Sequence, residues 1–214
     1  CGTELVPKKG HSYNEGEITT QSTCAVLGIK TFTCNDCGET KTEELALLEH
    51  IWSNCHCIEC GKGQTFTASK SIASLITEYG WTGSTTKQTF KLDDNVTVKI
   101  NGGTYTGNAY NGNQIRIYAT DSPAGTITIS VPEGFELVSV KVSAQTGTYA
   151  FLYVDGKSTD ISNVNTPVSG SSVLLKSVKN GADGKQVRVT ALEVVYKAPA
   201  CDHEWQDATC IEPI

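Results

Sequence analysis

The amino-acid sequence predicts an all-β protein: an antiparallel β-sandwich, jelly-roll or immunoglobulin-like, flanked by small Cys/His-rich β-hairpin units. Three observations support this prediction. Apolar and polar side chains alternate along much of 64–198. Turn-forming residues separate the alternating runs, as at Asn101, Gly102 and Gly103. All nine cysteines lie outside this region. Because no long helical pattern intervenes, a parallel α/β sheet is excluded.

The alternation predicts roughly seven or eight strands, each with side chains of one face directed into the core. The last run changes phase near Ala191, which predicts a β-bulge. The residues expected to point inward are Val96, Val98 and Ile100; Ile115 and Ile117; Ile127, Ile129 and Val131; Val138, Val140 and Val142; Ala150, Leu152 and Val154; Val173 and Leu175; and Val187, Val189, Leu192, Val194 and Tyr196.

One short helix is expected, from about residue 69 to residue 78. Ser69 or Ser71 can cap its N-terminus, and Gly80 can end it. Its apolar stripe consists of Ile72, Leu75 and Ile76.

The cysteine-rich ends contain a repeat: His, any residue, an aromatic residue, a cysteine, then Cys-x-x-Cys-Gly. We interpret 1–38 as the first Cys/His repeat, 39–63 as a shortened second repeat, 64–198 as the sandwich and 199–214 as the start of a further repeat. Cys1 is interpreted as the end of an earlier repeat, so the protein is expected to extend in both directions. The further repeat begins with His203, Trp205 and Cys210.

The repeats predict structural zinc sites. Two residues between cysteines allow both thiolates to bind one tetrahedral ion, and the following glycine relieves the tight turn. Four protein ligands leave no position for a reactive water, and such small units need help to fold. Disulfides are the alternative. The expected sets are His11, Cys24, Cys34 and Cys37 in the first repeat, and His50, Cys55, Cys57 and Cys60 in the second.

Charge and composition narrow the partners. The net charge is -6 without basic clusters, so nucleic acid is not an expected partner. No apolar run reaches the roughly 18 residues of a membrane-spanning helix, so no membrane span is expected in this segment.

The sequence does not predict an enzyme. All four histidines lie outside the sandwich region, which excludes a Ser-His-Asp site there. Paired carboxylates such as Asp93 and Asp94 could act without histidine, but they stand in turn-like contexts where aspartate commonly caps the backbone.

Exposed aromatic residues are the candidates for ligand binding by the sandwich. Trp81 either contributes to a binding surface or packs in the core. Tyr105 and Tyr110 belong to a Tyr/Asn/Gly-rich loop that suits stacking on a polar ligand but also suits a plain turn. Tyr118 and Tyr149 are further candidates.

Residues 10–52, "GHSYNEGEITTQSTCAVLGIKTFTCNDCGETKTEELALLEHIW", resemble the zinc-ribbon-like Cys/His repeats of large secreted or wall-anchored proteins of anaerobic Gram-positive bacteria. "SIASLITEYGW", "NGNQIRIYATDSPAGTITISVP" and "GKQVRVTALEVVYK" are similar to an uncharacterised β-sandwich module of such proteins. The resemblance implies a non-catalytic accessory or display segment outside the cytoplasm, secreted or attached to the cell surface. Its expected partners are neighbouring domains of a larger chain, and a glycan or a host or bacterial surface protein. A carbohydrate-binding module attached to a secreted glycoside hydrolase is the alternative.

Overall fold

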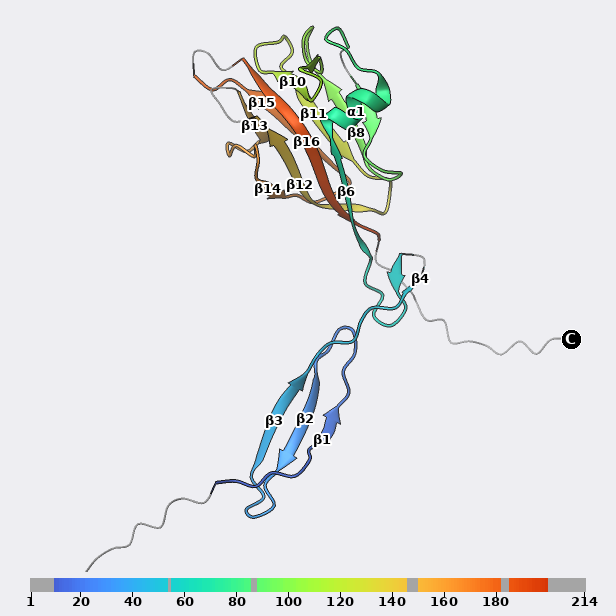
Figure 1. Ribbon diagram of the computed structural model, residues 1–214, viewed down its shortest axis with the longest axis vertical. Coiled ribbons are helices and arrows are strands. Elements are labelled where there is room, and N and C mark those ends of the chain that lie inside the picture. Colours follow the sequence, from blue (N-terminus) through green and yellow to red (C-terminus); the bar gives the residue numbers. More distant parts are fainter. Residues whose placement is uncertain (1–9, 54, 86–87, 146–149, 182–184, 200–214) are drawn as a thin grey trace, which may run out of the picture. The chain divides into compact units, whose positions relative to one another are not determined.

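The computed structural model describes residues 10–53, 55–85, 88–145, 150–181 and 185–199. The chain forms two compact units, shown in Figure 1. The first contains the described residues up to Lys62, and the second comprises Gly63–Pro199. Cys1, Tyr149 and the expected repeat beyond Pro199 lie outside the described residues.

The first unit consists of small antiparallel β-structures. β1 (Glu17–Thr20), β2 (Gly28–Thr33) and β3 (Thr40–Leu45) form a three-stranded sheet. β4 (Trp52–Ser53) and β5 (His56–Cys57) form a short hairpin. Within the described part of this unit, the only buried hydrophobic side chains are those of Cys24, Cys34 and Cys57. The unit therefore has almost no apolar core of its own.

The second unit is the predicted sandwich of two antiparallel sheets. One sheet has six strands: β14 (Asn165–Pro167), β12 (Glu136–Ala144), β16 (Gln186–Lys197), β10 (Gln114–Tyr118) and β9 (Ala109–Tyr110) in that order, with β6 (Thr65–Ser71) also paired to β16. The other has five: β13 (Phe151–Val154), β15 (Ser172–Val178), β11 (Thr126–Ser130), β8 (Thr97–Asn101) and β7 (Thr89–Lys91). The all-β prediction is confirmed. The sandwich has more strands than the seven or eight that the sequence predicts. Strands as short as β9 contain too few residues to show an alternation of apolar and polar side chains.

The core lies between the two sheets and follows the predicted alternation. The inward residues of β8, β10, β11, β15 and β16 are buried, and Ile100, Ile115 and Leu175 are completely inaccessible. Val138 is an exception, because its side chain is exposed. A break in register between Leu137 and Ser139 reverses the alternation there and places Leu137 in the core instead.

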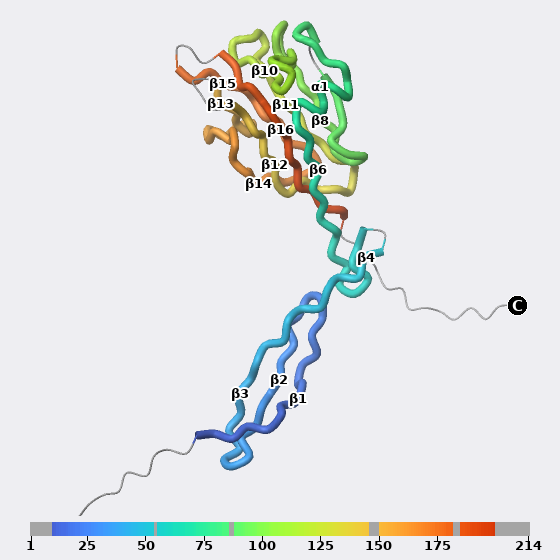
Figure 2. Tube along the Cα trace, viewed as in Figure 1, coloured from blue at the N-terminus to red at the C-terminus, as the bar shows by residue number. Residues whose placement is uncertain are grey.

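β16 is the longest strand and joins three neighbours in one sheet. Its N-terminal part pairs with β10, and its C-terminal part pairs with β6. Figures 1 and 2 show β6 beside the C-terminal part. The pairing with β12 shifts at Thr190, which separates the inward Val189 from the inward Leu192. This irregularity is the bulge that the phase change near Ala191 predicts.

The one helix among the described residues of the sandwich, α1 (Ile72–Tyr79), begins where β6 ends. Ser71 is its N-cap and accepts a hydrogen bond from the Ser74 N–H at 3.1 Å. Gly80 ends it with a left-handed φ of 64°. The helix is therefore confirmed. Ser71 rather than Ser69 is the cap, because β6 continues past Ser69 and ends at Ser71, directly before the first helical residue.

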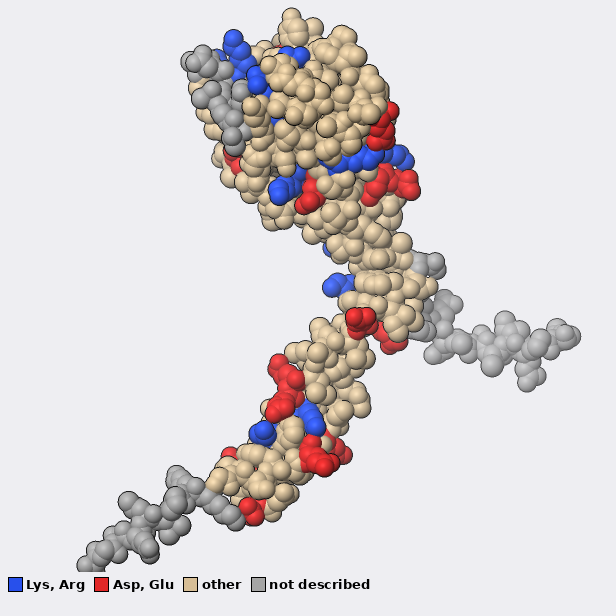
Figure 3. Space-filling view, in the orientation of Figure 1, with Lys and Arg blue, Asp and Glu red and all other residues tan. Residues whose placement is uncertain are grey.

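Charged residues are sparse and mixed in sign. On the face that Figure 3 shows, Lys and Arg lie beside Asp and Glu across the lower part of the sandwich, and a few further Lys and Arg lie at its upper left. Among the described residues, no helix has the length and apolar character needed to cross a membrane.

Candidate metal centres

Both Cys-x-x-Cys-Gly motifs form the same tight turn. In the first, the Cys34 N–H donates to the Glu39 carbonyl at 2.7 Å and the Gly38 N–H donates to the Cys34 carbonyl at 3.0 Å. In the second, Cys57 and Gly61 make the matching bonds at 3.0 and 2.8 Å. Both glycines have a positive φ, 75° and 69°, which explains the residue type at this position.

The first turn brings His11 to Cys34 and Cys37. One ligand atom from each of these residues lies within 4.8 Å of the others. The His11 Nδ1 is 3.3 Å from the Cys37 Sγ. On the other side of the ring, the Nε2 is 3.2 Å from a Glu39 carboxylate oxygen. A carboxylate in this position fixes the ring and keeps the Nδ1 lone pair directed at the cysteines.

The second turn gathers four residues: Cys24, His50, Cys57 and Cys60. The Cys60 Sγ is 3.5 Å from the His50 Nδ1, and the Cys24 Sγ is 3.6 Å from the Cys57 Sγ. Cys24 reaches this cluster from the connection between β1 and β2. The Leu48 N–H donates to the Thr23 carbonyl at 3.0 Å, so this connection is held beside the segment that leads to His50.

The turns also change the acidity of the thiols. The backbone N–H of Asp36, followed by other donors including His11, lowers the pKa of Cys34 to about 6. Burial opposes the charge of Cys57, but backbone N–H groups of the turn and His50 lower its pKa to about 6. Burial, with hydrogen bonds to Cys60 and Cys57, raises the pKa of Cys24 to about 12. Each turn thus contains one thiolate at neutral pH, which is the ligand form of cysteine.

The geometry suits a zinc ion. At ordinary Zn–S and Zn–N lengths, tetrahedral ligands lie about 3.8 Å apart for two sulfurs and about 3.5 Å apart for sulfur and nitrogen. The Cys24–Cys57 separation of 3.6 Å and the His50–Cys60 separation of 3.5 Å match these values. A disulfide requires a separation of about 2.05 Å. The described cysteines are all free, so both groups can hold a metal such as zinc.

The structure groups the eight sequence-predicted ligands differently from the expected sets. Cys24, expected with His11, lies in the cluster of the second repeat, and Cys55 belongs to neither cluster. Cys55 is exposed and has a positive φ of 66° at the end of the β4–β5 hairpin. The order of residues in the chain suggested four ligands per repeat. It could not show that the end of the β1–β2 hairpin contacts the next repeat.

The aromatic candidates of the sandwich separate into two groups. Trp81 is buried, with its ring 5.5 Å from that of Tyr79 and 5.0 Å from that of Phe90. It therefore occupies the core, in line with the packing alternative. Tyr105 is exposed, and its ring lies 5.8 Å from that of Tyr118.

Tyr110 belongs to a surface strip that also contains two arginines, which the sequence did not indicate. Arg116 on β10 and Arg188 on β16 are directly paired across the sheet. Their guanidinium carbons lie 5.1 and 4.7 Å from the Tyr110 ring centroid. Arg116 also lies 5.9 Å from the Tyr118 ring, which continues the strip toward Tyr105. We call these five residues, Tyr105, Tyr118, Arg116, Tyr110 and Arg188, the Tyr/Arg strip.

The strip is held in place by polar contacts beneath it. The Asp121 carboxylate accepts hydrogen bonds from the Tyr105 N–H at 3.2 Å and the Thr106 N–H at 2.9 Å. The Gln114 amide donates to Gln145 at 3.1 Å. The Arg116 Nε is covered, yet it makes no hydrogen bond within the described part of the protein.

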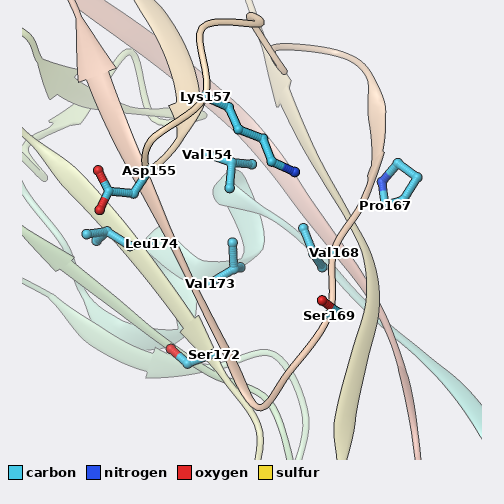
Figure 4. Close-up of a pocket in the computed structure, with 9 residues that line it drawn as sticks. All are labelled: Val154, Asp155, Lys157, Pro167, Val168, Ser169, Ser172, Val173 and Leu174. Carbon is cyan, nitrogen blue, oxygen red and sulfur yellow. The ribbon is translucent and has the colours of Figure 1, made fainter.

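A shallow groove of about 500 Å³ lies elsewhere on the sandwich, near β13 and β15 (Figure 4). Val154, Val168 and Val173, with Pro167 and Leu174, form its apolar part. Lys157 extends toward Pro167, whereas the Asp155 carboxylate points away from Lys157. The groove contains no converging set of polar groups comparable with the Tyr/Arg strip.

Comparisons of the chain with protein-family models, with curated proteins and with solved structures find no match. The fold and its clusters define a β-sandwich protein with an N-terminal unit that carries two Cys/His groups. Each group has the geometry to bind a metal ion.

Proposed function

We propose that this chain is a non-catalytic accessory or display segment of an extracellular bacterial surface protein. In this proposal the Cys/His repeats bind structural zinc and act as compact joints between neighbouring domains, and the sandwich is the displayed module. Secretion or surface attachment is part of the proposal, because the repeats resemble those of large secreted or wall-anchored proteins of anaerobic Gram-positive bacteria.

One observation carries the proposal. The buried hydrophobic side chains in the described part of the first unit are three cysteines, and each belongs to a Cys/His cluster. A unit of this size without an apolar core depends on a metal or on covalent links for its stability. Since the described thiols are free and the second cluster has four ligands, a structural metal is the better explanation. Four ligands leave no coordination position for catalysis.

The test is metal removal from the full chain, followed by hydrogen exchange and native mass spectrometry. Zinc should be released by a chelator, exchange should accelerate in 10–62, and exchange in 63–199 should stay slow, because the sandwich has its own core. A chain that binds no zinc under reducing conditions, or that exchanges equally fast with and without chelator, would exclude a structural metal.

A second candidate function is carbohydrate binding by the sandwich, as a module attached to a secreted glycoside hydrolase. The Tyr/Arg strip favours it, because an exposed tyrosine ring such as that of Tyr105 stacks on sugars and paired arginines bind carboxylate or sulfate groups. The ligand expected for this second candidate function is therefore an acidic glycan. A glycan array that includes uronic-acid and sulfated sugars tests it, and binding to no acidic glycan would exclude it.

A further inference from the structure

The two Cys/His clusters share one local structure. Tyr13 pairs with Cys34 in an antiparallel bridge, and Trp52 pairs with Cys57 in the same way. The histidine rings contact these aromatic rings at 5.7 Å in the first repeat and 4.9 Å in the second. The two repeats can therefore be compared position by position.

The cysteine at the end of the first hairpin serves the repeat after its own. Cys24 lies between the aromatic residue and the Cys-x-x-Cys turn of the first repeat, and its sulfur belongs to the cluster of the second repeat. Cys55 holds the matching place in the second repeat, between Trp52 and Cys57. It is exposed, its thiol is free, and it lies outside both clusters of the described residues. By the same relationship, Cys55 should serve the repeat that follows the second one.

The repeat that follows in the chain begins after the sandwich. His203 and Trp205 have the same spacing as His50 and Trp52. This segment lies outside the described residues. The place from which it starts, however, is fixed by the described residues that precede it.

The two ends of the sandwich leave it side by side. β6 and β16 are antiparallel neighbours, and their pairing continues to Thr65 and Lys197. Beyond this pair, the Ala198 N–H donates to the Gln64 carbonyl at 2.9 Å. The Ala198 carbonyl lies so close to Gly63 that there is no room for a side chain at this glycine. The sandwich therefore returns the chain to the point at which the chain entered it.

The following repeat consequently starts within reach of Cys55. The Cys57 N–H donates to the Lys62 carbonyl at 3.0 Å, and Lys62 is bonded directly to the first residue of the sandwich. Five residues lead from Ala198 to His203, and they can span roughly 17 Å. Since Cys55 is only two residues from Cys57, this length is enough to bring the His203 imidazole to the Cys55 thiol.

We propose that Cys55 and His203 bind one metal ion, in a third Cys/His site that the second repeat shares with the repeat beginning at His203. Cys55 then does for His203 what Cys24 does for His50. The metal links the chain before the sandwich to the chain after it, so the series of repeats continues past the module. This inference rests on the proposed structural zinc, because the same coordination joins the first two repeats.

The residues on both sides suit such a site. A thiolate and an imidazole are ligands of structural zinc, and Cys201 and Cys210 are two further thiols near His203 in the sequence. Ile51 and Ile58 are 57% and 60% exposed, and the Ile58 N–H donates to the Ile51 carbonyl at 2.9 Å, so both belong to the hairpin that ends at the free thiol. Exposed apolar side chains beside an exposed thiol are expected at a contact surface.

The experiment measures how fast iodoacetamide alkylates each cysteine of the full chain, with and without zinc, in anaerobic buffer and by peptide mass spectrometry. The thiolate is both the nucleophile and the metal ligand, so a metal-bound cysteine should react more slowly than a free one. Cys55 is exposed and should react quickly after a chelator is added. In the zinc-loaded wild type it should be protected, to the same degree in dilute and in concentrated solution, because both ligands belong to one chain.

Variants of the second ligand test the assignment. His203→Ala should abolish the protection of Cys55 and leave the cysteines of the second cluster protected. Glu204→Gln is the matched control, because it changes the neighbouring side chain and should keep Cys55 protected. His203→Cys should restore the protection that His203→Ala removes, because a thiolate also binds zinc.

Three outcomes would overturn the inference: a Cys55 that reacts equally fast with and without zinc, protection that persists in His203→Ala, or protection that is lost on dilution. The last outcome would place the second ligand in another chain. The proposed function fails separately, when zinc does not protect the cysteines of the second cluster either. If those cysteines are protected and Cys55 is not, the structural zinc stands and the third site is wrong.

Discussion

The Sγ atoms of Cys24 and Cys57 lie 3.6 Å apart, although 33 residues separate the two cysteines in the chain. This contact joins the end of the β1–β2 hairpin to the Cys-x-x-Cys turn of the second repeat. It makes the candidate metal site a property of two successive repeats.

Cys24→Ser should weaken zinc binding at the second cluster by at least about 100-fold, because a lost ligand costs more than the roughly 10–100-fold typical of a lost outer partner. Competition with a zinc chelator gives the affinity, and thermal unfolding of 10–62 should shift with it. Cys55→Ser is the matched control and should leave this site unchanged in the monomer, since Cys55 lies outside the cluster. A loss of zinc at the second cluster in Cys55→Ser but not in Cys24→Ser would favour the grouping by sequence order.

Glu39→Gln should weaken metal binding at the first cluster by about tenfold, the lower end for an outer partner, because the carboxylate is exposed. The cause is the lost contact with the His11 Nε2 at 3.2 Å. Titration with Zn²⁺ or Co²⁺ in a background that combines Cys24→Ser with Cys57→Ser isolates this site, because the second cluster then keeps only His50 and Cys60. Glu43→Gln removes a carboxylate from an ion pair with Lys41 instead and should have no effect. An unchanged affinity in Glu39→Gln would mean that the carboxylate does not position the ring.

Asp93→Asn should destabilise the sandwich by about 1–3 kcal/mol, the usual cost of breaking hydrogen bonds to a charged group. One Asp93 oxygen accepts from the Asn95 and Val96 N–H groups at 2.9 and 2.7 Å, and the other accepts from the Tyr196 hydroxyl at 2.8 Å. Chemical denaturation measures the loss. Asp94→Asn changes an exposed neighbour and should stay within about 0.5 kcal/mol of wild type. A similar loss in both variants would point to net charge rather than to the hydrogen bonds.

Tyr110→Ala should abolish binding to an acidic glycan, if the sandwich binds one, because this ring supports both arginines of the strip. Tyr153→Ala is the control, since Tyr153 lies on β13 in the other sheet and contacts Phe151. Isothermal titration with the best glycan from the array measures the loss. Binding that survives Tyr110→Ala but is lost in Tyr153→Ala would place the ligand on the other sheet.

The sandwich was largely predictable because its signals are local. Alternation, turn residues and the caps of α1 are all read from neighbouring positions, and the structure confirms the antiparallel sheets, the helix and the bulge in β16. The second bulge, beside Val138, was not predictable, because a register shift within a run of valines leaves no mark on the sequence. The pairing of Arg116 with Arg188 depends on the register between β10 and β16, which are far apart in the chain.

The sequence by itself determined which residues have the chemistry of metal ligands, since the spacing of Cys-x-x-Cys-Gly and its histidine defines a turn with two thiols and a nearby imidazole. Only the tertiary structure decided that Cys24 belongs with His50 and that Cys55 is left exposed. The physical reason is the length of the two hairpins. The long β1–β2 hairpin carries its end to the next repeat, whereas the β4–β5 hairpin ends at Cys55, away from its own cluster.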